Sequence, residues 1–197
     1  MRWRVLFFLI GLGSWACTDS GSPVDFGDRS GPIFPLKLGN KWAYRISYYD
    51  TLGAKFQVSY DTMTILTRTM VENQEWYLWR DPDAYLSDQP GGTWYRNIRT
   101  DTMSQAGLFY KYPASVGESW ATPYMMYSTL TLTLTSANSV VEVPAGRFGC
   151  YVYQIERTQN VEFLVPGIGL VYSELYPGVP SGKHYKYVRE LTSYSVN

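Results

Sequence analysis

Apolar and polar side chains alternate with a period of two along most of the chain, which is typical of β-strands. The clearest case is LTLTLT at 130–135, where we expect the leucines to point inward and the threonines outward. Strand-like segments also cover 42–48, 56–69, 76–80, 93–99 and 185–194. The sequence therefore predicts an all-β fold, a mainly antiparallel sheet curled into a barrel or half-barrel with little helix.

Two turns that contain proline and glycine divide the segment 143–176 into strands. VPAG at 143–146 places proline where a type I turn fixes φ and glycine at the exit of the turn. VPGI at 165–168 places glycine at the third position, where a type II turn requires a positive φ. Bulky side chains occur on both faces of the strands around these turns, so we expect them to lie in the middle of a sheet.

Three segments carry a resemblance to known proteins. FPLKLGNKWAYR at 34–45, VPAGRFGCYVYQI at 143–155 and VPGIGLVYSE at 165–174 together resemble uncharacterised β-rich lipoproteins and secreted proteins of the bacterial envelope. The resemblance implies a mostly antiparallel β domain that is exposed to the periplasm or the cell exterior. It implies no activity and no functional residue.

One short pattern occurs twice. FPLKLGNKW at 34–42 and YPASVGESW at 112–120 share an aromatic residue, proline, glycine and tryptophan at equal spacing. Proline and glycine four residues apart before a tryptophan predict a sharp loop that inserts a ring into the core. We interpret the pair as a strand-start motif used twice, and two equivalent ligand sites as the less favoured alternative.

The first 16 residues have the pattern of a secretory signal. Arg2 and Arg4 precede the apolar run VLFFLIGL at 5–12, and mostly small residues lead to Cys17. A small residue and a cysteine directly after an apolar run resemble the end of a lipoprotein signal, so we expect Cys17 to carry lipid. Ser14 stands where such signals usually have leucine, and ordinary cleavage is the alternative.

A short polar segment follows the cysteine. Residues 17–32 are rich in Gly, Ser, Pro and Asp, which predicts a flexible tether that holds the domain on the order of 20 Å from the bilayer. Thr18, in place of aspartate, resembles the sorting pattern of outer-membrane lipoproteins. We therefore expect a bacterial envelope lipoprotein, facing the periplasm or the exterior, with a single antiparallel β domain at 33–197.

Charge and cysteine content exclude several classes of protein. Without Arg2 and Arg4 the chain has 15 basic and 17 acidic residues, and such balance predicts no binding to nucleic acid. If Cys17 carries lipid, Cys150 is left alone, and we expect a small buried side chain rather than a reactive thiol. If Cys17 is not lipidated, a Cys17–Cys150 disulfide is the alternative.

Motifs for catalysis or for a cofactor are missing from the sequence. The chain has one histidine and no C-x-x-C, H-E-x-x-H or G-x-S-x-G motif, so we expect no bound cofactor and no enzyme of these classes. The segment 81–92 gathers Asp81, Asp83 and Asp88 beside two glycines, a weak candidate for a calcium site. A solvated acidic loop is the favoured interpretation.

Aromatic side chains are concentrated around this segment. They could stack on sugars or apolar ligands if their rings are exposed, or pack inside the domain, which we favour. The candidate ligand contacts are Trp76, Tyr77, Trp79, Tyr85, Trp94 and Tyr95.

Two functions of different class follow from these observations. The first is a non-catalytic envelope lipoprotein, anchored to the bilayer, which binds a glycan, an apolar molecule or another envelope protein. The second is a carboxylate-dependent hydrolase, for example a glycan-directed enzyme that uses Glu156 and Glu174 on neighbouring strands. The second requires the two carboxyl groups to lie about 5–10 Å apart in an open cleft.

Overall fold

Strands form throughout the part of the chain that the structure describes. The computed structural model describes residues 23–80, 84–97, 106–124, 128–156, 159–176 and 186–197. Within these ranges every regular element is a β-strand. The same ranges contain no helix of the length and apolar character needed to cross a bilayer.

The strands form two antiparallel sheets. The large sheet has the order β2-β1-β13-β12-β11-β10-β9-β8, with β1 Lys41–Tyr49, β2 Lys55–Thr64, β8 Ser119–Tyr124, β9 Ser128–Val143, β10 Gly146–Ile155, β11 Val161–Val165, β12 Gly169–Leu175 and β13 Lys186–Ser195. The small sheet has the order β3-β4-β5-β6-β7, with β3 Arg68–Val71, β4 Gln74–Arg80, β5 Ala84–Gln89, β6 Gly92–Asn97 and β7 Gly107–Lys111. The prediction of an all-β, mainly antiparallel fold is confirmed.

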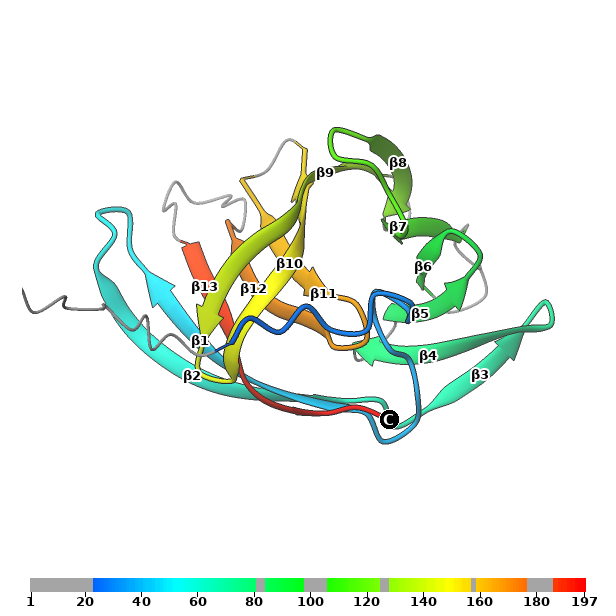
Figure 1. Cartoon of the computed structure of the whole chain (residues 1–197), viewed down its shortest axis with the longest axis horizontal. Coiled ribbons are helices and arrows are strands. Elements are labelled where there is room, and N and C mark those ends of the chain that lie inside the picture. Colours follow the sequence, from blue (N-terminus) through cyan, green and yellow to red (C-terminus); the bar gives the residue numbers. More distant parts are fainter. Residues whose placement is uncertain (1–22, 81–83, 98–105, 125–127, 157–158, 177–185) are drawn as a thin grey trace, which may run out of the picture.

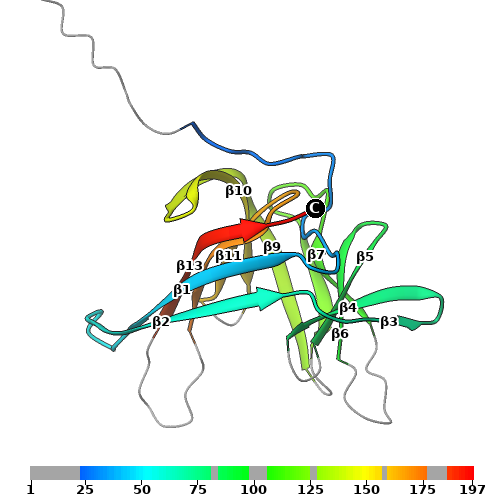
Figure 2. The same ribbon diagram turned by 90° about the horizontal axis from the view of Figure 1, so that it is seen from below.

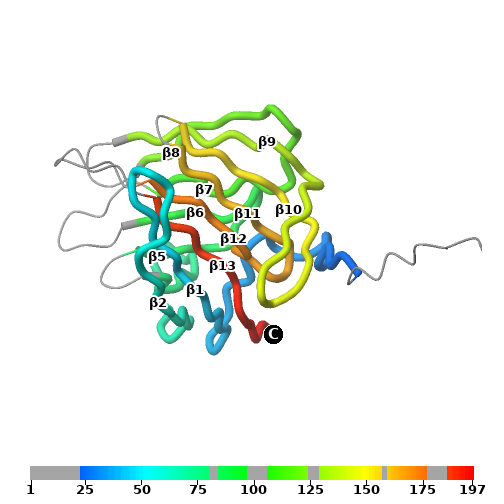
Figure 3. Tube along the Cα trace, turned by 90° about the vertical axis from the view of Figure 1, so that its left-hand side faces the viewer, coloured from blue at the N-terminus to red at the C-terminus, as the bar shows by residue number. Residues whose placement is uncertain are grey.

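The two sheets curve around a shared interior (Figure 1). The large sheet runs from β8 and β9 at the top of Figure 3 to β1 and β2 at the bottom, and it curls enough for β9 to contact β12 and β13. The small sheet contacts both edge strands of the large sheet, because β7 contacts β8 and β4 contacts β2. No hydrogen-bonded ladder between described strands joins the sheets, so the fold is a strongly curled, open arrangement rather than a closed barrel.

The inward face of the large sheet carries both apolar and polar side chains. Cross-strand partners share a face of a sheet, and the register places one row of residues side by side across six strands. That row consists of Ile46, Arg189, Ser173, Glu162, Tyr153 and Leu134, all buried. A carboxyl group and a guanidinium group therefore lie inside the domain, where each needs a partner.

The two predicted turns occur as hairpins. The first connects β9 to β10 and pairs Val143 with Gly146. In the second, between β11 and β12, the Ile168 N–H donates to the Val165 carbonyl over 3.0 Å, and Gly167 has φ 77°. A positive φ at the third residue of a turn is the requirement of type II, as predicted.

The repeated motif has the same geometry in both places. Gly39 and Gly117 both have φ 88°. The Gly39 N–H donates to the Ile65 carbonyl over 2.8 Å, and the Gly117 N–H donates to the Leu134 carbonyl over 2.7 Å. Each loop thereby fixes the start of a strand, β1 or β8, against the next strand in the chain. The interpretation as a strand-start motif used twice is confirmed.

The segment predicted to be a flexible tether is partly docked. Residues 25–32, here called the N-terminal strap, pass over the β9–β10 hairpin and the β11–β12 turn; the strap is part of the blue trace in Figure 1. The Asp25 N–H donates to the Arg147 carbonyl, and the Gly149 N–H donates to the Asp25 carbonyl, both over 2.8 Å. The Gly167 N–H donates to the Pro32 carbonyl over 2.8 Å. This part of the segment 17–32, which we predicted to be a flexible tether, therefore makes backbone contacts with the β domain.

Glycines on both sides of the contact, one in the β9–β10 hairpin and one in the strap itself, allow the strap to approach the two hairpins closely. A Cβ atom at Gly149 would lie 2.2 Å from the Phe26 ring, and a Cβ atom at Gly27 would lie 2.1 Å from the Pro166 carbonyl oxygen. The Arg29 guanidinium carbon lies 4.9 Å from the centre of the Phe26 ring, and the guanidinium donates to Asn138. Composition does not reveal this close backbone approach at glycine, which lets the strap lie against the two hairpins.

The strand boundaries differ from prediction in two places. The segment 56–69 is divided between β2 and β3, because the chain leaves the large sheet after Thr64 and begins the small sheet at Arg68. Residues 84–89, which we expected to form a solvated acidic loop, are strand β5, paired with both β4 and β6. Asp81 and Asp83 lie outside the described residues.

Candidate functional site

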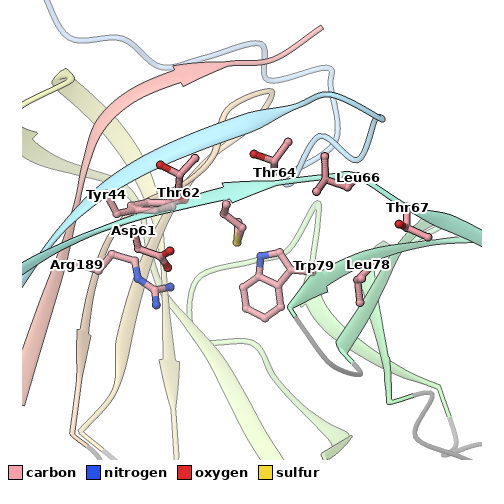
Figure 4. Close-up of a pocket in the computed structure, with 10 residues that line it drawn as sticks. Tyr44, Asp61, Thr62, Thr64, Leu66, Thr67, Leu78, Trp79 and Arg189 are labelled. Carbon is pink, nitrogen blue, oxygen red and sulfur yellow. The ribbon is translucent and has the colours of Figure 1, made fainter.

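A cleft opens between the free edge of β2 and strand β4 and leads toward the interior (Figure 4). Its volume is about 490 Å³. In Figure 2, β2 and β4 lie next to each other at the front of the molecule. The described residues that line this side cleft are Tyr44, Asp61, Thr62, Met63, Thr64, Leu66, Thr67, Leu78, Trp79 and Arg189.

The edge position of β2 creates the side cleft. The register places Asp61 opposite Tyr44 and Met63 opposite Trp42, so Asp61 and Met63 share the inward face of the sheet. Among the strands that the structure describes, none pairs with the outer edge of β2. The inward side chains of β2 therefore border an opening instead of a neighbouring strand.

Arg189 forms the charged floor of the side cleft. It comes from β13, opposite Ile46 of β1, and only 7% of its surface is exposed. Its guanidinium carbon lies 5.4 Å from the centre of the Tyr44 ring, and its Nε is buried without a hydrogen-bond partner. Figure 4 shows the guanidinium group pointing into the cleft near Asp61.

Tyr44 stays a neutral phenol on this floor. Burial raises its pKa, and its hydroxyl donates to the Leu170 carbonyl over 2.9 Å. This bond fixes the ring against β12, and the ring face is left for the Arg189 guanidinium. An arginine over a tyrosine ring is a favourable contact, but the ring does not neutralise the charge.

Deeper in the interior, Glu162 connects the two sheets. The Tyr110 hydroxyl of β7 donates to the Glu162 Oε2 of β11 over 2.7 Å, and both residues are buried. Burial raises the pKa of Glu162, although the Tyr110 hydrogen bond and the Arg189 charge act in the opposite direction. Glu162 therefore attracts Arg189 from a distance but is already engaged by Tyr110.

The opposite end of the side cleft is mainly apolar. Leu66 and Leu78 lie there beside Trp79, together with Thr67 (Figure 4). The Trp79 ring meets the Phe34 ring edge-on at 6.3 Å. The Trp79 Nε1 is buried without a hydrogen-bond partner. The side cleft thus combines an apolar end with two buried donors that lack acceptors.

The six predicted aromatic contacts do not form one surface. Tyr77 and Tyr95 are both aligned with Leu86 across the small sheet, and both pack in the core with Trp79. Neighbouring residues of a strand face opposite sides of the sheet. The residues directly before Tyr77, Leu86 and Tyr95 therefore face the other side, and these are Trp76, Tyr85 and Trp94. Of the six, only Trp79 lines the side cleft.

The calcium prediction finds no support at Asp88. Asp88 lies on β5, where its carboxylate accepts from the Thr93 hydroxyl over 3.2 Å and from the Leu36 backbone N–H. Within the described residues, no group of three potential ligands among His, Cys, Asp and Glu is assembled. Asp88 connects β5 to β6 and to the segment before β1, which is a structural role.

This role predicts a pH-dependent stability. Burial raises the pKa of Asp88 to about 6, from an ordinary value of 3.8. The folded protein therefore holds this proton more tightly than the unfolded chain, and stability falls as the pH rises from about 4 to about 6. Urea denaturation near pH 4 and near pH 7 should show a loss of up to about 3 kcal/mol in the native protein that Asp88→Asn lacks.

Asp28→Asn is a control of opposite sign. Hydrogen bonds from Ser30 lower the pKa of Asp28, so any stability that it contributes is lost as the pH falls below its ordinary range. The assignment for Asp88 is contradicted if the native protein and Asp88→Asn keep a constant difference in unfolding free energy over this range of pH.

The proposed carboxylate pair is not part of the side cleft. Glu174 accepts from the hydroxyl groups of Tyr172 and Tyr176 over 2.6 and 3.2 Å, and from the Lys186 Nζ over 3.3 Å. Burial acts to raise the pKa of Glu174, but the Tyr172 hydrogen bond and the Lys186 charge outweigh it and lower the pKa. Glu156 is exposed at the end of β10. Glu174 is thus held as an ionised structural group.

Cys150 is fully buried and free. Burial raises the pKa of its thiol to about 12, so the expectation of a small buried side chain is confirmed. Cys17, the predicted lipid attachment site, lies outside the described residues.

Sequence reasoning did not identify Arg189, Tyr44 or Asp61. One signal was available: Leu191 is apolar and inward on β13, and a period of two places Arg189 on the same face. A charged residue at an inward position of a strand indicates a buried charge. Which residues would face it could not be known without the order of the strands.

Comparison with known proteins gives similarity of fold only. No family model and no curated protein matches the chain. Two solved structures are similar, a candidate lipoprotein from Parabacteroides distasonis with a TM-score of 0.40 and a candidate exported protein with a YmcC-like fold from Bacteroides fragilis with a TM-score of 0.41. In each case the identity is 13%, and the match covers 84% of this chain and 99% of the other.

Proposed function

We propose that the protein is a non-catalytic lipoprotein of the bacterial envelope that binds a small, partly apolar molecule in the side cleft. The observation that carries the proposal is the side cleft itself. Its volume of about 490 Å³ lies in the range of small-molecule sites, which are concave, mainly apolar and equipped with a few polar groups.

The lining residues favour binding over catalysis. None of the described lining residues is serine, cysteine or histidine, which are the common nucleophiles and bases. A hydrolase that uses two carboxyl groups would need them about 5–10 Å apart, and Asp61 is the single carboxylate among these lining residues. The side cleft therefore offers contacts to a ligand but no pair of reacting groups.

The lipoprotein assignment rests on residues 1–17 and on the strap. Seven residues separate Cys17 from Asp25, and such a segment spans at most about 28 Å when fully extended. With the strap docked, lipid on Cys17 would keep the β9–β10 hairpin toward the bilayer. Labelling of cells with a clickable fatty acid should mark the native protein and not Cys17→Ala, which keeps the buried Cys150. Label retained in Cys17→Ala would contradict the assignment.

Binding can be tested with a neutral fluorescent probe. N-phenylnaphthylamine, which is apolar and uncharged, should bind the mature protein saturably at one site. Met63→Trp, which adds a bulky ring inside the side cleft, should abolish this binding. Tyr60→Trp is the matched control, because Tyr60 lies on the same strand, is 76% exposed and does not line the cleft.

Two results would contradict the binding proposal. One is the absence of saturable binding to the native protein. The other is unchanged binding in a Met63→Trp variant whose circular dichroism and melting temperature are those of the native protein.

A further inference from the structure

The Arg189 guanidinium is a buried charge without a matching ion pair. Charged side chains are rarely buried unless they are paired, because removal from water is costly. Arg189 is 7% exposed, its Nε has no hydrogen-bond partner, and none of the ion pairs among the described residues includes it. The guanidinium group lies over the Tyr44 ring, which carries no charge to balance it.

Neither nearby acid completes the site. Glu162 attracts Arg189, but its carboxyl group is hydrogen-bonded to Tyr110 and forms no ion pair with the arginine. Asp61 is exposed at the rim of the side cleft and also forms no ion pair with Arg189. A hydrogen-bond acceptor that enters the cleft would meet a guanidinium group that is already removed from water in the folded protein, so binding would not add that cost.

The end of the side cleft away from Arg189 is mainly apolar. Leu66, Leu78 and Trp79 lie at that end together with Thr67, and Arg189 lies at the other end (Figure 4). The volume of about 490 Å³ suits one small molecule with an apolar body. Such a molecule would bury its apolar part against Trp79 and direct a polar head to Arg189.

Resting on the proposed function, we infer that the ligand is an amphiphile with one acidic head group, a carboxylate, phosphate or sulfate. The Arg189 guanidinium pairs with this head, and planar guanidinium donors match the oxygens of all three groups. The apolar body occupies the end of the cleft near Leu78 and Trp79. Asp61 at the rim weakens the attraction through like charge.

Two probes of nearly the same shape test the inference. Anilinonaphthalene sulfonate carries an acidic group on the skeleton of the neutral probe N-phenylnaphthylamine. The quantity measured is the ratio of the affinities of the mature protein for the acidic and the neutral probe. We expect Arg189→Met to lower this ratio at least about tenfold, since a charge-assisted contact is lost, while Arg189→Lys retains part of it.

The chain offers a matched control for the loss of charge. Arg45 lies on the opposite face of the large sheet, since it alternates with the inward Tyr44 and Ile46, and it pairs with Glu190 over 3.0 Å. Arg45→Met removes the same charge from the same sheet, and it should leave the affinity ratio unchanged. An equal fall in the ratio for Arg45→Met would overturn the inference, because the effect would then come from net charge.

A second variant keeps the inference testable if Arg189→Met does not fold. Asp61→Asn alters an exposed residue, and it should raise the affinity for the acidic probe about two- to fivefold without changing that for the neutral probe. If Asp61→Asn leaves the ratio unchanged, or if folded Arg189→Met does, the inference is overturned while the binding proposal stands. If the neutral probe does not bind the native protein, the binding proposal itself fails.

Displacement of the acidic probe distinguishes the chemical sources of the head group. Decanoate and decyl phosphate should both displace it, and decanol should do so at least about tenfold less well. Displacement by decanoate alone points to a fatty acid, and displacement by decyl phosphate alone points to a phosphate lipid. Equal displacement by decanol would overturn the inference.

Discussion

Replacement of Gly92 by alanine is expected to destabilise the protein by roughly 3 kcal/mol or more, because strain and overpacking act together. Gly92 begins β6 with φ 137°, a conformation that other residues rarely adopt. A Cβ atom there would lie 2.0 Å from the Tyr110 carbonyl oxygen and 2.8 Å from the Tyr112 nitrogen. Both atoms belong to the backbone around β7, which cannot move without shifting Tyr110 and its hydrogen bond to Glu162.

Gly91 provides the matched control in the same turn. It has φ 94°, but no atom lies within 4 Å of a Cβ built on it. Gly91→Ala should therefore cost only the backbone strain, on the order of 1–2 kcal/mol. Urea denaturation followed by circular dichroism measures both variants. Equal losses for the two would show that the backbone of β7 accommodates the methyl group.

The local elements could be predicted from the sequence because their causes are local. Alternation of side chains predicted most strands, and the turns at 143–146 and 165–168 follow from the φ requirements of proline and glycine. The repeated motif was visible because Gly39 and Gly117 occupy the same place relative to a following tryptophan. Each of these features is determined within about ten residues of the chain.

The strap could not be predicted, because its partners are distant in sequence. Its composition is that of a linker, and its contacts with the domain are hydrogen bonds to backbone groups of Arg147, Gly149 and Gly167. In the sequence Gly149 is one more glycine in a strand, and only the Phe26 ring above it explains why a side chain is excluded there. The composition of a segment indicates how much apolar surface it can bury by itself. It does not indicate which hydrogen bonds and packing contacts a distant segment can supply.

The candidate site was missed for a related reason. The sequence drew attention to clusters of aromatic and acidic residues near 76–95, where neighbouring positions alternate between the two faces of the small sheet. The side cleft instead combines Tyr44, Asp61, Trp79 and Arg189 from four strands. Their proximity depends on strand order, which period-two patterns do not specify.

The strand-start motif predicts unequal losses at its two tryptophans. Trp42 is fully buried, its ring centre lies 5.1 Å from that of Phe34, and its Nε1 donates to the Ile168 carbonyl over 2.6 Å. Trp42→Ala should cost about 3–5 kcal/mol through the cavity that it leaves. The Ile168 carbonyl would lose its donor as well, at about 1–3 kcal/mol if no water replaces it.

Trp120 is the internal comparison, because it holds the same place in the second motif. It is only half-buried, and its Nε1 is shared between the Leu108 and Phe109 carbonyls at 3.1 and 3.2 Å. Solvent can reach the space left by Trp120→Ala, so we expect a loss of about 1–3 kcal/mol. Urea denaturation followed by far-ultraviolet circular dichroism avoids dependence on tryptophan fluorescence. A loss for Trp120→Ala that matches or exceeds that for Trp42→Ala would mean that burial of the first motif against the β11–β12 turn does not set its contribution.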